Sequence, residues 1–81
     1  MTLGELADRY RVELQDETTG VRRSWEEMFR YTFRHCSEEA DLSAFEASSL
    51  SDRLLASGMN PQIVQGYVER WLGLLSWAKT I

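Results

Sequence analysis

The residues that follow Asn60 constrain the fold of this chain more than any other stretch. Asn is a favoured helix N-cap because its side-chain oxygen accepts a bond from a free backbone N–H, and Pro61 fits the first helical position, where a missing N–H is harmless. Apolar residues then recur in steps of three and four, at Ile63, Val64, Tyr67, Val68, Trp71, Leu74, Leu75 and Ala78. This spacing predicts a helix over residues 60–79 whose broad apolar face other helices must cover.

Three further helices are predicted upstream, over residues 2–14, 21–36 and 47–57. Thr2 and Glu5 have the spacing of a capping box at the start of the first one, and Gly58 stands where a helix commonly ends in a left-handed glycine. Residues 15–20 are polar and turn-like, so we expect a loop there. With no strand pattern, four helices joined by short loops predict one compact all-α domain spanning residues 1–81.

The apolar residues of these helices are predicted to form the core. In the third helix Leu50, Leu54 and Leu55 are expected to face inward. Leu42 and Phe45, in the connection before it, are expected to anchor that connection under the core. The apolar stripe of the second helix comprises Trp25, Met28, Phe29, Thr32, Phe33 and Cys36.

Composition places the chain among soluble globular domains. Its 81 residues carry a net charge of −4, which works against a nucleic-acid partner, since such proteins usually present a basic surface. The single cysteine, Cys36, permits no internal disulfide, and no apolar run is long enough to span a membrane. We therefore expect a soluble cytoplasmic domain without a membrane partner.

The charge is distributed unevenly along the chain. Residues 1–20 sum to −3 and residues 37–58 to −4, whereas residues 21–36 hold four arginines against two glutamates, a net +2. Residues 59–81 sum to +1. The second and fourth predicted helices are thus the net-positive ones, and a local basic face can act despite an acidic total because salt screens charges beyond about 8 Å.

Arg23, Arg30 and Arg34 are predicted to lie within about 40° of one another on the second helix, away from its apolar stripe. This is the best candidate binding surface in the sequence. In the alternative interpretation, Arg23 pairs with Glu27 and Arg30 with Glu26 at i,i+4 spacing, which leaves only Arg34 and Arg22 free. Most aromatic side chains fall on apolar stripes and are interpreted as core, whereas Trp77 is expected on the shoulder of the last helix.

Catalytic and cofactor chemistry finds no support in the sequence. His35 is the only histidine, and its neighbour Cys36 would point about 100° away on a helix, so the two do not form a nucleophile–base pair. One Cys and one His provide no metal-ligand spacing, and no glycine-rich phosphate loop is present. We expect a domain that is not an enzyme and that binds no metal or cofactor.

Several stretches together resemble the core-binding domain of the tyrosine recombinases, the phage-integrase family. They are TLGELADRY at residues 2–10, RSW at residues 23–25 and LLASGMNPQIV at residues 54–64, followed by Tyr67, Leu74, Leu75, Trp77 and Ala78. Each motif alone is weak, but they occur in family order over nearly the whole chain. The chain departs from the family at Ile63, where Thr is common, and at Gly66, where a basic residue is common.

The resemblance implies a four-helix, SAM-like domain that forms half of a clamp around double-stranded DNA. A separate catalytic domain of the same bacterial or phage-encoded chain would carry out integration or recombination, and the parent would act as a tetramer on DNA while the isolated domain is monomeric. In the family the second and fourth helices face the DNA. The residues expected to contact it here are Arg22, Arg23, Ser24, Arg30, Arg34, Gln62, Gln65 and Arg70.

A second interpretation remains open at the level of the sequence. The acidic net charge favours a helical protein–protein interaction module that does not bind DNA. Its docking groove would lie along Gly66, Gly73 and Trp77 of the last helix, where small residues leave a low-profile polar face.

Overall fold

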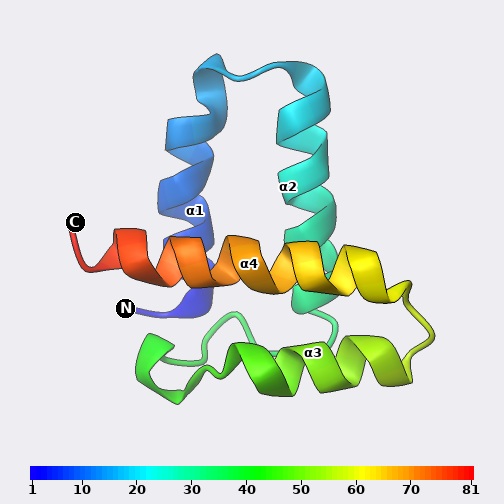
Figure 1. The fold of residues 1–81 in the computed structure, drawn as a ribbon. Coiled ribbons are helices and arrows are strands. Elements are labelled where there is room, and N and C mark those ends of the chain that lie inside the picture. Colours follow the sequence, from blue (N-terminus) through cyan, green and yellow to red (C-terminus); the bar gives the residue numbers. More distant parts are fainter.

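The computed structural model describes residues 1–81 and contains four α-helices and no β-strand, which confirms the predicted all-α four-helix class. The helices are α1 (Leu3–Glu13), α2 (Thr19–Thr32), α3 (Ala47–Ala56) and α4 (Pro61–Ala78), and short 3₁₀ turns occupy Leu14–Asp16 and Leu42–Ala44. Figure 1 shows two antiparallel hairpins: α1 with α2, and α3 with α4. The second hairpin runs across the first, so that α4 crosses both α1 and α2.

Local capping chemistry sets several helix ends as predicted. Thr2 and Glu5 form the reciprocal capping box of α1, and the Asn60 side chain accepts from the backbone N–H of Gln62 at the start of α4. Gly58 has a φ of 91°, the left-handed conformation that ends α3 and turns the chain into α4. The turn between α3 and α4 is therefore encoded by a glycine and an N-cap only two residues apart.

The core forms where the two hairpins cross, and Trp71 of α4 lies in its middle. Trp71 is fully buried, and its ring packs against those of Phe29, Phe33 and Phe45 with centroids 5.2–6.4 Å apart. Its indole N–H donates to the Thr32 hydroxyl at 2.9 Å. The other fully or nearly fully buried apolar residues are Leu3, Leu6, Ala7, Leu14, Met28, Leu50, Leu54, Val64, Tyr67 and Leu74.

The predicted bounds of the second helix were wrong at both ends. It begins at Thr19, two residues early, because the Thr18 side chain accepts from the N–H of Val21 and acts as the N-cap. It ends at Thr32, four residues early, because the backbone tightens into turns that bond back three residues, from Arg34 to Tyr31 and from His35 to Thr32.

Two residues predicted to face the core are largely exposed. Leu55 of α3 is 43% exposed and Ile63 of α4 is 48% exposed. Leu50 and Leu54 already fill the contact of α3 with the core, and Val64 does so at the start of α4. The apolar stripes predicted for these two helices were thus wider than the surface that their neighbours cover. Leu42 and Phe45 do pack against the core as predicted.

The start of α1 is tied to the connection between α2 and α3. The backbone N–H groups of Leu3 and Gly4 donate to the carbonyls of Ala40 and Glu38 at 2.9 and 2.8 Å. Glycine suits this close approach, since a Cβ at position 4 would lie 3.1 Å from Glu38 and would make a tight contact. The connection, whose only regular element is the short 3₁₀ turn Leu42–Ala44, is therefore held in place by its bonds to α1.

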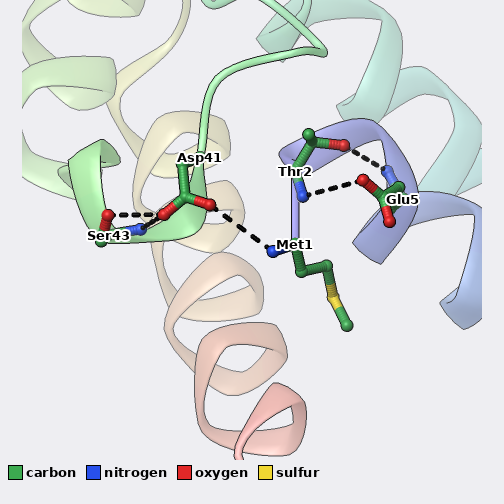
Figure 2. Close-up of polar contacts among 5 residues, drawn as sticks. All are labelled: Met1, Thr2, Glu5, Asp41 and Ser43. Atoms are coloured by element: carbon green, nitrogen blue, oxygen red, sulfur yellow. Dashed lines mark hydrogen bonds and ion pairs between the residues drawn. The ribbon is translucent and has the colours of Figure 1, made fainter.

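Asp41 completes this attachment (Figure 2). Its carboxylate accepts from the Ser43 backbone N–H at 3.0 Å and from the Ser43 hydroxyl, and it also lies 3.5 Å from the amino group of Met1. The Ser43 bonds, more than the charge of the amino group, hold the pKa of Asp41 below its usual value, because they stabilise the ionised form.

Replacing Thr32 with Val tests the central polar contact. The substitution keeps the volume but leaves the buried Trp71 N–H without a partner, so urea denaturation should show a loss of about 1–3 kcal/mol in unfolding free energy. Thr32→Ser retains the oxygen and is the control, with an expected loss of no more than about 1 kcal/mol for the methyl group. Equal stability of Thr32→Val and wild type would contradict this account.

Replacement by alanine should change the stability of the protein in opposite directions at two of its glycines. Gly58→Ala forces a side chain into the left-handed region and should lower stability by about 1–2 kcal/mol. Gly73→Ala adds a Cβ that meets no atom within 4 Å in a helix interior, and it should raise stability by about 0.5–1 kcal/mol. Thermal unfolding of both variants checks the pair, and a shift of the same sign in both would contradict the assignment.

Candidate nucleic-acid interface

Four arginines project from α2 and the turn after it without a carboxylate partner. Arg22, Arg23, Arg30 and Arg34 are all exposed, and none takes part in the three ion pairs of the structure. The i,i+4 pairing of Arg23 with Glu27 and of Arg30 with Glu26, which would have neutralised this surface, does not form. We call these four side chains the arginine face.

Glu26 lies among these arginines but is paired with Arg11 of α1. The Arg11 guanidinium donates to both Glu26 oxygens, at 2.7 and 3.2 Å, and also pairs with Asp8. The same guanidinium lies 5.1 Å from the centre of the Phe29 ring. The bond to Glu26 is the main reason that the pKa of Arg11 is raised. This contact between α1 and α2 leaves the neighbouring arginines free.

Tyr31 contacts the two arginines at the C-terminal end of the arginine face, Arg30 and Arg34. The Arg30 and Arg34 guanidinium carbons lie 5.5 and 4.9 Å from the centre of its ring, within the range of cation–π attraction. The ring is backed by Tyr67 of α4, with centroids 6.4 Å apart. Arg34 therefore belongs to the face although it lies beyond the end of α2.

Ser24 and Arg70 connect α2 to α4. The Arg70 guanidinium donates to the Ser24 hydroxyl at 2.9 Å and lies 4.8 Å from the centre of the Trp25 ring. Both residues are partly buried, so they form an interhelical contact at the edge of the arginine face. A ligand would find the remaining N–H donors of Arg70 already oriented by these two contacts.

Gln62 and Gln65 occupy the first turns of α4, and both are exposed. The Gln65 amide donates weakly to Glu69 at 3.4 Å, and no hydrogen bond joins either glutamine to α2. The structure thus connects Arg70 and Ser24 directly, and it leaves the two glutamines as separate exposed groups on the same helix as Arg70.

The predicted residues of α2 form a continuous row. Arg22 and Arg23 line one shallow hollow together with Arg11 and Glu26. Arg23 and Arg30 line the next one together with Glu26 and Glu27. The Tyr31 contacts then lead from Arg30 to Arg34. The row therefore runs the full length of α2.

A second, more apolar groove lies between α4 and the first hairpin. It has a volume of about 530 Å³ and is lined by Tyr10, Trp25, Gly66, Glu69, Arg70, Gly73, Leu74 and Trp77. Trp77 is half-buried on the shoulder of α4, and its ring packs against that of Tyr10 at 5.2 Å. The predicted groove beside Gly66 and Gly73 therefore exists, with an aromatic wall.

His35 and Cys36 line one hollow beside α3, together with Glu46 and Arg53. Cys36 is partly buried, and burial raises the pKa of its thiol, which disfavours the reactive thiolate. No group of three His, Cys, Asp or Glu side chains has an arrangement that would hold a metal ion.

Sequence reasoning missed the two residues that shape the face, Tyr31 and Arg11. Tyr31 lies outside the apolar stripe of α2. Its place next to Arg30 and three residues before Arg34 was the sequence signal that could have identified it as their contact. For Arg11 no local signal existed, because its partner Glu26 lies fifteen residues away on another helix.

Comparison of the chain with protein-family models, curated proteins and solved structures finds no match. None of its helices combines the length and the apolar character that crossing a membrane requires.

Proposed function

We propose that this chain is a DNA-binding domain that contacts duplex DNA through the arginine face of α2, with Arg70 and Ser24 at its edge. The observation that carries the proposal is the absence of any ion pair at Arg22, Arg23, Arg30 and Arg34 in a protein whose net charge is −4. Exposed, unpaired guanidinium groups in a row are suited to the phosphates of a DNA backbone.

The distribution of acid supports a directional mode of binding. Glutamates and aspartates concentrate on α1, on the loop after it and on the α2–α3 connection, whereas α2 holds three arginines against two glutamates and α4 carries no net charge, with one arginine and one glutamate. DNA would therefore be attracted to one side of the molecule and repelled from the other. Arginine contacts to phosphates would set the register, and Gln62 and Gln65 on α4 would reach base edges, with adenine as the expected partner of a glutamine.

Within this proposal the domain is the core-binding part of a site-specific tyrosine recombinase. The four-helix architecture and the order of the sequence motifs support this assignment. The domain would clamp the DNA, and a catalytic domain outside residues 1–81 would supply the nucleophile. The role of the present residues is then binding and orientation, with no reaction step of their own.

The groove beside α4 favours a second candidate, a protein-interaction module. Its wall consists of Tyr10, Trp25 and Trp77, and aromatic side chains are enriched in protein interfaces. The acidic net charge also suits a partner other than DNA. The two surfaces meet at Arg70, and chemical-shift mapping with duplex DNA distinguishes the candidates: shifts of the four arginines of the arginine face support the first, and unperturbed signals there support the second.

Removing two arginines should weaken DNA binding in a salt-dependent way. At low salt, Arg30→Ala/Arg34→Ala should bind a fluorescent duplex more weakly than wild type, because two phosphate contacts are lost. The slope of log K against log salt should flatten by roughly 0.9 for each lost contact. Fluorescence anisotropy over a series of salt concentrations measures both quantities.

Arg9→Ala/Lys79→Ala is the matched control. It removes the same amount of charge from exposed positions on α1 and just after α4, outside the arginine face. Its slope should stay within error of wild type. Equal losses in the two double variants would show that only overall charge matters, and unchanged binding by Arg30→Ala/Arg34→Ala would overturn the proposed interface.

A further inference from the structure

We infer that Tyr31 is a positioning residue that holds Arg30 and Arg34 ready for phosphate, an inference that rests on the proposed function. The two guanidinium carbons lie over a single tyrosine ring, at 5.5 and 4.9 Å from its centre. Neither of them forms an ion pair with a carboxylate. The ring is thus the one contact the structure gives to both arginines.

The chemistry of a stacked guanidinium makes this arrangement useful. All five N–H donors of arginine lie in the plane of the group, so stacking on a ring engages the face and leaves the donors free. A carboxylate partner would instead occupy those donors and cancel the charge. Tyr31 therefore restricts two long side chains while preserving their capacity to bind a phosphate bidentately.

The position of the ring is itself fixed from behind. Tyr31 is half-buried, and its ring lies 6.4 Å from that of Tyr67, which is only 8% exposed. Burial is the main cause that raises the pKa of Tyr67, with smaller contributions from Glu27 and Tyr31, so this second ring stays neutral. The two arginines are hence connected through Tyr31 to the core of the domain, although Arg34 lies in a turn.

Loss of the ring should act on affinity without changing the number of phosphates contacted. In Tyr31→Leu both arginines can still reach the DNA, but each must be immobilised on binding, so affinity should fall about five- to tenfold at every salt concentration. The slope of log K against log salt should stay at the wild-type value, because the same cations are released. In a plot of log K against log salt, the Tyr31→Leu line should therefore run below the wild-type line and parallel to it. The line of Arg30→Ala/Arg34→Ala should instead be flatter.

Two further variants, Tyr31→Phe and a triple variant, test this inference. Tyr31→Phe keeps the ring and should bind like wild type, whereas a loss equal to that of Tyr31→Leu would assign the effect to the hydroxyl and overturn positioning. Circular dichroism confirms that each variant is folded before titration.

The decisive measurement places Tyr31→Leu in the Arg30→Ala/Arg34→Ala background. If Tyr31 acts only through these arginines, the triple variant should bind DNA no more weakly than the double variant. A further loss of five- to tenfold would overturn the inference. Should the double variant itself bind like wild type, the proposed function fails; should the double variant lose binding while Tyr31→Leu does not, only the role of Tyr31 fails.

Discussion

The fold depends on a single buried contact between the two hairpins, that of Trp71 with Thr32 and the surrounding phenylalanines. Helix α4 is the only element that crosses both α1 and α2, and Trp71 lies in its middle (Figure 1). An indole buried this deeply needs a partner for its N–H, and the Thr32 hydroxyl supplies one while donating to the Met28 carbonyl at 2.8 Å. This bond and the aromatic packing fix where α4 crosses α2, and hence where Arg70 meets Ser24.

The same crossing decides which charges are available for binding. Closure of the α1–α2 hairpin places Arg11 against Glu26, so this glutamate forms its ion pair with α1 and not with Arg30. Packing of α4 places Tyr67 behind Tyr31 and Trp25 beneath Arg70. Aromatic rings therefore hold three of the predicted binding arginines, and each of these rings is positioned by residues that also belong to the core or border it.

Sequence reasoning reached the helices because their causes are local. The Thr2–Glu5 box, the Asn60 cap and Gly58 each act within a few residues, and the structure contains all three. It failed where a distant partner or the extent of a neighbouring helix decides the outcome. Periodicity defined the apolar stripes of α3 and α4, which contain Leu55 and Ile63. How far each stripe is covered depends on the size of the surface that packs against it. Likewise, the i,i+4 rule gave Glu26 a partner on its own helix, whereas tertiary structure gave it Arg11.

The way in which the arginines are held bears on how an acidic domain would bind a polyanion. An arginine fixed by a carboxylate contributes no net charge, so a surface built from such pairs would add nothing to offset an overall charge of −4. An arginine fixed by an aromatic ring keeps its full charge and its in-plane donors. Because α2 carries Tyr31 and Trp25 among its arginines, the domain can concentrate rigid positive charge on one face without becoming basic as a whole. Such a face would attract DNA in one orientation, since the acid on α1 and on the connection between α2 and α3 opposes an approach from those sides.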